Sequence, residues 1–195
     1  RLSGEDKDKA ILQVARLKLN NQQPDEALEA LRRISVGTLR RNAKMNTEKT
    51  LIEAKARAER GQTERALSIL SRLGDTAEAE QLKADIAWEK GEWREASDAL
   101  LALLSKRGIS VQQEPLDENQ AELVLNTAVA LNLAGETQTL QAFQARYQNQ
   151  MAETGQAGLF QIVTRPPGQS YLSGRETLLS IVEEVDLFSD VISDL

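Results

Sequence analysis

The sequence predicts an all-α protein, an irregular solenoid of about four helical hairpins followed by a C-terminal extension with a capping helix. Ala, Leu, Glu, Gln, Arg and Lys dominate the 195 residues, whereas aromatic residues make up 4% and prolines number four. This amino-acid composition favours helix over strand. One local pattern also recurs: a small residue, a turn position seven residues later, and a small or apolar residue five after that. Its four copies are Ala15…Gln22…Ala27, Ala54…Gly61…Ala66, Ala84…Gly91…Ala96 and Ala128…Gly135…Leu140. Hairpins that repeat in this way stack and bury a continuous core.

The first hairpin begins at a predicted N-cap, Ser3, and its apolar residues keep helical spacing until Asn20 and Asn21 interrupt them. Pro24 suits the first turn of the second helix, because its fixed φ is already helical there. Residues 35–46 form a basic extra segment, either an extension of this second helix or a loop.

The second and third hairpins follow the pattern most closely, with Gly61 and Gly91 at their turns. Asp75, with Glu78 three residues later, has the form of a capping box that starts the third hairpin. Residues 108–115 are predicted to be a loop, since they end in a proline that disfavours helix at the residue before it.

The fourth hairpin begins at another capping-box pattern, formed by Asp117 and Gln120, and ends near Met151. We therefore assign residues 1–153 to the repeat domain and residues 154–195 to the extension.

The extension is predicted to contain two elements. Residues 159–163 fit a short extended segment, and a capping-box pattern from Ser173 opens a final amphipathic helix. Residues 176–195 include six acidic residues and no basic one. We expect this helix to dock on the fourth hairpin as a cap; the alternative is exchange into the basic first half of a neighbouring molecule.

Charge is distributed unevenly along the chain. Residues 1–73 carry 16 Lys and Arg against 10 Asp and Glu, whereas residues 74–195 carry 8 against 20. Binding of nucleic acid needs a dense basic track with stacking aromatic residues, and the basic half has no Trp, Tyr or Phe. We therefore expect no nucleic-acid partner.

The absence of Cys and His from the sequence removes thiolate and imidazole metal ligands, Cys nucleophiles and Ser-His-Asp triads together. No phosphate-binding loop, dinucleotide fingerprint, nucleophile elbow or calcium loop occurs. We therefore expect no catalysis, no cofactor and no metal.

The sequence holds no apolar window long enough to span a membrane and no signal pattern at its beginning. A start at Arg1, without Met, indicates a mature product or a piece of a longer protein. We expect a soluble protein, with composition that suits cytosol and periplasm equally.

The repeated pattern resembles the tetratricopeptide repeat over roughly residues 8–151. In that family a small residue of the first helix is followed by a turn glycine, an aromatic residue two later and an alanine three after that. Ala84, Gly91, Trp93 and Ala96 match all four positions. The other copies depart from it, with Thr63 for the aromatic residue, Gln22 for the glycine and Leu140 for the alanine. Intervals of 39, 30 and 44 residues between equivalent alanines, against about 34 in a regular repeat, imply insertions. A plain helical bundle is the alternative fold.

The resemblance implies that first-helix positions line a concave inner face of mixed charge with apolar patches. Transferred position by position, that face presents Lys9, Leu12, Arg16, Asn20, Glu48, Leu51, Lys55, Glu59, Leu82, Asp85, Trp88, Glu89, Glu122, Leu125, Val129 and Asn132. The candidate partner-binding residues are Arg16, Lys55, Asp85, Trp88 and Asn132. The alternative for Trp88 is a core position, and for Arg16 and Lys55 a solvated charge. The face lacks the set of residues with which some members clamp a C-terminal carboxylate.

These observations favour a scaffold or adaptor domain that binds a peptide or helix of another protein in the groove. The alternative is a structural or assembly module of a larger bacterial-type protein, acting through self-association. An enzyme that uses carboxylates on small molecules or glycans is a third class, which would need a deep closed pocket.

Overall fold

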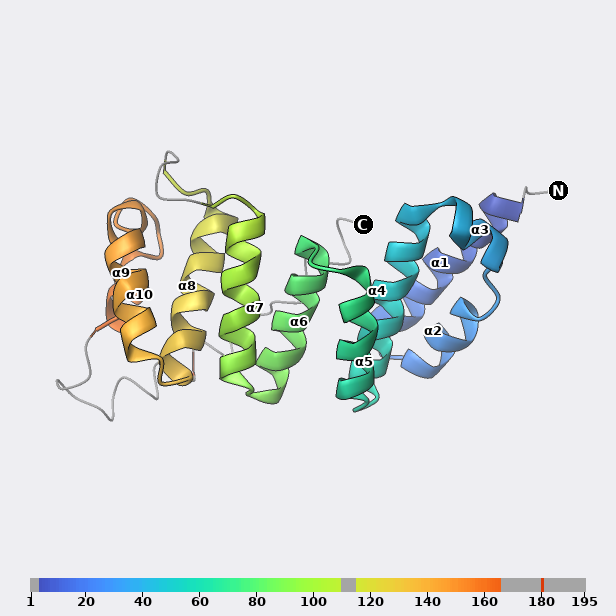
Figure 1. Cartoon of the computed structure of the whole chain (residues 1–195), viewed down its shortest axis with the longest axis horizontal. Coiled ribbons are helices and arrows are strands. Elements are labelled where there is room, and N and C mark those ends of the chain that lie inside the picture. Colours follow the sequence, from blue (N-terminus) through green and yellow to red (C-terminus); the bar gives the residue numbers. More distant parts are fainter. Residues whose placement is uncertain (1–3, 110–114, 166–179, 181–195) are drawn as a thin grey trace. The chain divides into compact units, whose positions relative to one another are not determined.

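The computed structural model describes residues 4–109, residues 115–165 and Ser180. Within these residues the regular structure is helical and no strand occurs, which confirms the all-α prediction for this part of the chain. The elements are α1 (Gly4–Asn20), α2 (Pro24–Leu31), α3 (Val36–Arg41), α4 (Ala43–Glu59), α5 (Thr63–Leu70), the 3-10 turn η1 (Ser71–Leu73), α6 (Ala77–Lys90), α7 (Trp93–Lys106), α8 (Glu118–Leu133), α9 (Thr137–Met151) and α10 (Ala157–Val163) (Figure 1). Apart from Ser180, the final helix predicted from Ser173 lies outside the described residues.

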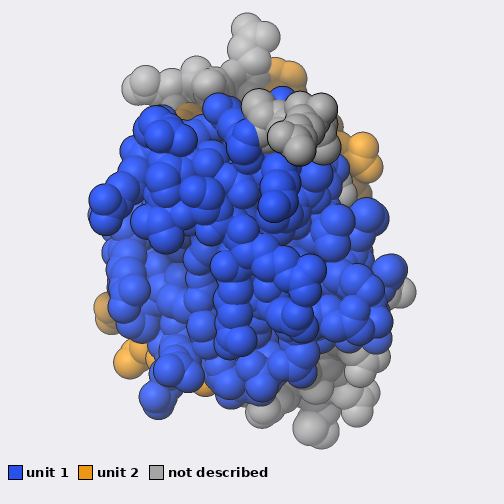
Figure 2. Space-filling model, turned by 90° about the vertical axis from the view of Figure 1, so that its right-hand side faces the viewer, with its two compact units in different colours: residues 1–82, 190–195 blue, residues 83–189 orange. Residues whose placement is uncertain are grey.

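The described chain divides into two compact units. Described residues up to Leu82 belong to unit 1 and those from Lys83 to unit 2, shown in different colours in Figure 2. The division falls inside α6. Unit 1 contains hairpins one and two, and unit 2 contains α7 and hairpin four. The boundary predicted at residue 153 stays a prediction.

The four predicted hairpin turns share one backbone conformation. The turn residue has a positive φ in each: 57° at Gln22, 74° at Gly61, 69° at Gly91 and 74° at Gly135. Its N–H donates to the carbonyl three residues back, and the next N–H donates to the carbonyl five residues back. This pair of bonds is the Schellman motif, which satisfies carbonyls left open at a helix end. Gln22 therefore occupies the position that glycine holds in the other three turns.

The small residues that define the pattern are buried in all four copies. The seven alanines of the pattern are 0% exposed and Leu140 is 6% exposed. An alanine side chain adds little thickness to a helix, so two backbones can come close without a cavity. The same turn therefore joins α1 to α2, α4 to α5, α6 to α7 and α8 to α9, and contacts between the two helices are present in the first, second and fourth of these pairs.

The shared turn predicts opposite effects for two substitutions. Gly135→Ala should lower the free energy of unfolding by about 1 kcal/mol, because a left-handed conformation costs that much for a residue with a Cβ. A Cβ at Gly135 would meet no atom within 4 Å, so no clash contributes to the loss. Gln22→Gly should instead raise stability by about 0.5 kcal/mol, since relief of the same strain exceeds the entropy that glycine adds to the unfolded chain. Urea unfolding of both variants measures whether the free energy of unfolding falls in Gly135→Ala and rises in Gln22→Gly. A change in the same direction in both variants would show that the two turns are not equivalent.

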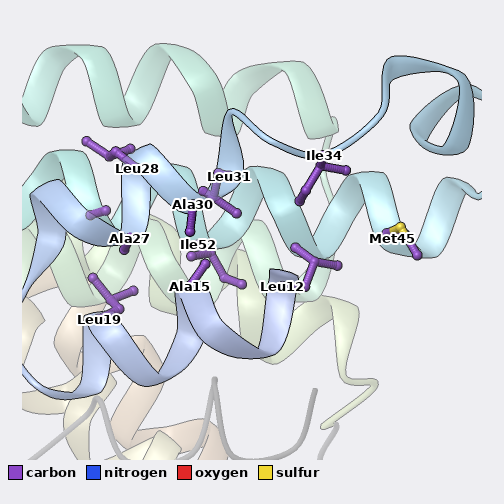
Figure 3. Packing of buried hydrophobic residues seen from close by; sticks show 11 residues of the cluster. Leu12, Ala15, Leu19, Ala27, Leu28, Ala30, Leu31, Ile34, Met45 and Ile52 are labelled. Carbon is purple, nitrogen blue, oxygen red and sulfur yellow. The ribbon is translucent and has the colours of Figure 1, made fainter. Parts of the chain in front are cut away.

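The core of unit 1 lies between hairpin one and α4. Figure 3 shows Ala15, Ala30 and Ile52 gathered among α1, α2 and α4. The buried cluster comprises Leu12, Ala15, Leu19, Ala27, Leu28, Ala30, Leu31, Ile34, Met45, Ile52 and Ala56. Helix α4 also contacts α5, and its Leu51, Ala54 and Ala58 are buried as well. Helix α4 is thus buried on two sides, which leaves two narrower strips of its surface for polar residues.

Residues 35–46, left open between a helix extension and a loop, form α3 and the first turn of α4. The Oδ1 atom of Asp8 accepts a hydrogen bond from the N–H of Ser35 at 3.3 Å, at the N-terminus of α3. The side chain of Asn42 caps α4, accepting from the N–H of Met45 at 3.0 Å. Helix α3 is therefore an insertion between hairpins one and two, and it accounts for the long interval of 39 residues between Ala15 and Ala54.

Unit 2 is built around α8, which is buried on nearly every side. From Leu123 to Leu131 all nine residues are buried, and α7, α9 and α10 contact the helix; Figure 1 shows α8 between α7 and the pair α9 and α10. The predicted capping box is confirmed, because the N–H of Gln120 donates to Asp117 Oδ1 at 2.8 Å and the N–H of Asp117 donates to Gln120 Oε1 at 3.1 Å.

The segment that follows α7 is held against α9 by Tyr147. The Tyr147 hydroxyl donates a hydrogen bond of 3.0 Å to the carbonyl of Ile109. Burial raises the pKa of Tyr147 above 10.0, although the positive charge of Arg146 opposes the increase. The raised pKa keeps the hydroxyl protonated, so that it can donate this hydrogen bond.

Two local predictions are wrong. Residues 159–163, expected to be extended, belong to α10, where Phe160 and Val163 are buried three positions apart on one helical face. The cap of α6 lies one residue later than Asp75, because the hydroxyl of Thr76 accepts from the N–H of Ala79 at 3.2 Å.

Candidate interaction surface

The polar face predicted for unit 1 runs along α1 and α4. Its side chains follow the same spacing on the two helices, seven and then four residues apart, so each set lies on one strip of its helix. The two sets are Lys9, Arg16 and Asn20 on α1 and Glu48, Lys55 and Glu59 on α4. Lys9, Asn20 and Glu59 are exposed, and the other three are partly exposed. We call these six residues the first-helix face.

An ion pair joins the two halves of the first-helix face. The Nη2 atom of Arg16 contacts Oε1 of Glu48, and the side chains are only 18% and 16% exposed. The Nε atom of Arg16 is buried without a hydrogen-bond partner in the described part of the chain. Arg16 therefore links hairpins one and two, in addition to any role toward a partner.

The predicted apolar patches of this face are absent from the surface. Leu12, Leu51, Leu82, Leu125 and Val129 are all buried, with at most 3% of each exposed. They contribute to the cores of their units. The expected mixture of charge and apolar patches is therefore wrong, and the first-helix face is polar.

Asp85 and Trp88 of α6 are buried as well. Asp85 is 0% exposed and Trp88 is 6% exposed. The prediction that Asp85 is a surface residue is wrong because every residue from 79 to 88 except Lys83 is buried, which leaves no solvated strip there. The Trp88 ring packs edge-to-face on Trp93, with 5.3 Å between ring centroids, so the core alternative describes its environment.

Asn132 has an internal role at the end of α8. Its Nδ2 atom donates a hydrogen bond of 2.6 Å to the carbonyl of Val163, the last residue of α10. The amide thus satisfies one of the carbonyls that the end of α10 leaves open. Of the five predicted site residues, the structure brings Arg16 and Lys55 to one face of unit 1, and it places Asn132 in an internal contact of unit 2.

A second polar strip of α4 holds a chain of ion pairs that was not predicted from the sequence. Glu53 accepts from Lys49 at 2.6 Å and from Arg57 at 2.9 Å, and Arg57 also donates to Gln62 at 3.2 Å. Burial by itself raises the pKa of Glu53, but the hydrogen bonds and charges of Lys49 and Arg57 outweigh it and leave the pKa below 4.5. The signal was present in the sequence as alternating charges four residues apart.

Comparisons with family models, with curated proteins and with solved structures find no match to this chain. Among the residues that the structure describes, no group of three or more His, Cys, Asp or Glu side chains is placed to hold a metal ion. Over the same residues, no helix has both the length and the apolar character needed to cross a membrane.

The ion pairs of Glu53 predict a dependence of stability on pH. Because the folded state lowers the pKa of Glu53, its stabilising contribution is present above pH 4.5 and is lost as the pH falls through the folded-state value. Glu53→Gln should lower the free energy of unfolding by about 1–2 kcal/mol near neutral pH, because the side chain is only 20% exposed. Below pH 4.5 the wild type and the variant should converge.

Glu29→Gln is the matched control for this measurement. Glu29 makes the same type of pair with Arg33, four residues away, but its side chain is 65% exposed. Such a pair contributes little, so this variant should unfold like the wild type at every pH. A constant difference between Glu53→Gln and the wild type from neutral to acid pH would contradict the assignment.

Proposed function

We propose that this chain is a protein-binding scaffold or adaptor, an irregular tetratricopeptide-like array that holds a peptide or a helix of another protein along the first helices of its hairpins. The recurrence of one Schellman turn with buried small or apolar residues on both sides of it, four times along the chain, supports this proposal most strongly. Repetition of a hairpin produces an extended surface, which suits binding of an extended or helical segment.

The first-helix face of unit 1 is the surface on which we place binding. It crosses two hairpins and carries charges of both signs beside the half-buried pair of Arg16 and Glu48. A face without exposed large apolar residues favours a partner with alternating charges over an apolar anchor. Specificity would then come from the order of charges along the bound segment.

The test is selection of binding peptides from a displayed random library on the full-length protein. Affinity of an enriched peptide should fall about fivefold to tenfold in Lys55→Glu, because reversal of a partly exposed charge removes attraction and adds repulsion. Arg65→Glu is the control, since Arg65 is an exposed cation of α5 outside the face. Thermal melts of both variants are recorded in parallel, and a loss of affinity counts as a binding effect only where the variant remains folded at the temperature of the binding measurement. Absence of any enriched peptide, or equal effects of the two variants, would overturn the proposal.

The second candidate is an assembly role through self-association, as part of a larger bacterial-type protein. The observation that favours it is the charge asymmetry between residues 1–73 and 74–195. Opposite charges on two regions of one chain attract between copies at low ionic strength.

A further inference from the structure

A dense group of exposed cations lies where hairpin one passes into hairpin two. Residues 32–44 contain five basic residues and no acidic one. The five are Arg32, Arg33, Arg40, Arg41 and Lys44, and all are exposed. We call this group the basic corner.

The basic corner is built by the inserted helix α3. Thr38 is the buried residue of that helix, whereas Val36 is 63% exposed. The bond from Ser35 to Asp8 and the contact of Asn42 Nδ2 with Glu5 Oε1 at 3.2 Å anchor the two ends of the insertion. The insertion thus packs Leu39 against the core of unit 1 while it presents Arg40, Arg41 and an apolar side chain to solvent.

Most of the charge of the basic corner is not neutralised within the described chain. Arg33 pairs with Glu29 at 2.7 Å. Among the described residues the structure gives no ion pair to Arg32, Arg40, Arg41 or Lys44. Uncompensated cations at this density attract an acidic partner over about one Debye length.

The acidic segment 176–195 has the complementary sequence. It contains six acidic residues, no basic residue and several large apolar ones, and apart from Ser180 it lies outside the described residues. We propose that the basic corner of one molecule binds the acidic segment 176–195 of a second copy of this chain, which is the exchange that the sequence offers as the alternative to a cap on the fourth hairpin. Two copies that exchange segments form two equivalent contacts, which is the arrangement expected of a twofold dimer.

Three observations support this occupant. The corner is exposed in the single chain, which leaves it accessible to a second copy. The exposed Val36 lies beside the cations and offers an apolar surface. A segment that carries large apolar residues as well as acidic ones can contact both. Residues 1–73 contain no aromatic side chain, so the corner lacks the stacking platform that single-stranded nucleic acid uses. The inference rests on the assembly role and not on peptide binding, because the corner and the first-helix face share no residue.

Sedimentation of the full-length chain at low and high salt tests the proposal. The wild type should approach twice the mass of a single chain at low salt and return to the single-chain mass at about 0.5 M salt, where the Debye length is a few ångströms. Arg40→Glu with Arg41→Glu should abolish the dimer. Arg65→Glu with Arg72→Glu is the matched control, because it reverses two exposed cations of the same unit outside the corner, and it should keep the dimer.

A mixture of two variants tests directly whether the acidic segment is exchanged between copies. Glu183→Lys with Glu184→Lys should also be a monomer by itself. In a mixture with the Arg40→Glu, Arg41→Glu variant, the intact corner of the first variant can bind the intact segment of the second. A heterodimer should therefore form, at a higher protein concentration than the wild-type dimer requires. Failure of the mixture to associate would overturn the proposal. So would a wild type that is monomeric at low salt, whether its corner binds its own segment, anionic vesicles or DNA.

Discussion

Phe160→Ala is expected to lower the free energy of unfolding by about 3 kcal/mol, at the low end of the range for loss of a buried aromatic ring. Phe160 is 2% exposed and lies on α10, which contacts both α8 and α9. Phe160 and Val163 are the two buried residues of this seven-residue helix. Loss of the ring removes the larger of these two buried side chains. Detachment of α10 would also leave Asn132 without the Val163 carbonyl that it contacts.

Ile162→Ala is the matched control, because Ile162 belongs to the same helix but is 43% exposed. Its removal should change stability by less than about 1 kcal/mol. Circular dichroism melts and urea unfolding compare the two variants. If Phe160→Ala and Ile162→Ala unfold alike, α10 does not stabilise hairpin four.

The hairpins can be predicted from sequence because their determinants are local. A turn that ends one helix and begins the next depends on one left-handed residue and its neighbours, and small residues at fixed distances from it set the helix contact. This is why the spacing of Ala15 and Ala27 locates the turn at Gln22, although that residue is not a glycine. Its φ of 57° confirms that spacing outweighs residue type.

The predictions that fail depend on contacts between elements. Helical spacing places Asp85 on one side of α6, but only the neighbours of α6 decide whether that side meets solvent, and it is 0% exposed. Residues 159–163 satisfy an extended pattern as well as a helical one, because a five-residue apolar run contains too few positions to separate the periods. Packing of Phe160 and Val163 selects the helix.

The candidate surface was predictable in part, where it depends on spacing along a single helix. Equivalent spacing on α1 and α4 brought Arg16 and Lys55 to one face of unit 1. Their surroundings were not predictable, because the pair of Arg16 with Glu48 spans 32 residues of sequence. The chain of Lys49, Glu53 and Arg57 could have been found, since pairs four residues apart need only one helix.

Ala96→Leu should destabilise the protein by about 1–3 kcal/mol, because a larger side chain at a closely packed contact forces off-rotamer conformations and backbone shifts. Ala96 is 0% exposed and its N–H bonds to the carbonyl of Glu92 at 2.9 Å, in the first turn of α7 directly after the Gly91 turn. The added methyl groups therefore enter a region whose backbone is fixed on both sides of the turn. Ala66→Leu should have the same effect in unit 1, since Ala66 holds the equivalent position after Gly61 and is also 0% exposed.

The same substitution at an exposed position separates overpacking from an effect of leucine itself. Ala145 lies on α9 and is exposed, and Ala and Leu have similar helix propensities. Ala145→Leu should therefore change the free energy of unfolding by less than about 0.5 kcal/mol. A double variant with leucine at both Ala66 and Ala96 should lose close to the sum of the single losses, because the two positions belong to different hairpins in different units. If Ala96→Leu proves as mild as Ala145→Leu, the surroundings of Ala96 are looser than its burial indicates, and the buried alanines of the pattern would not mark closely packed positions.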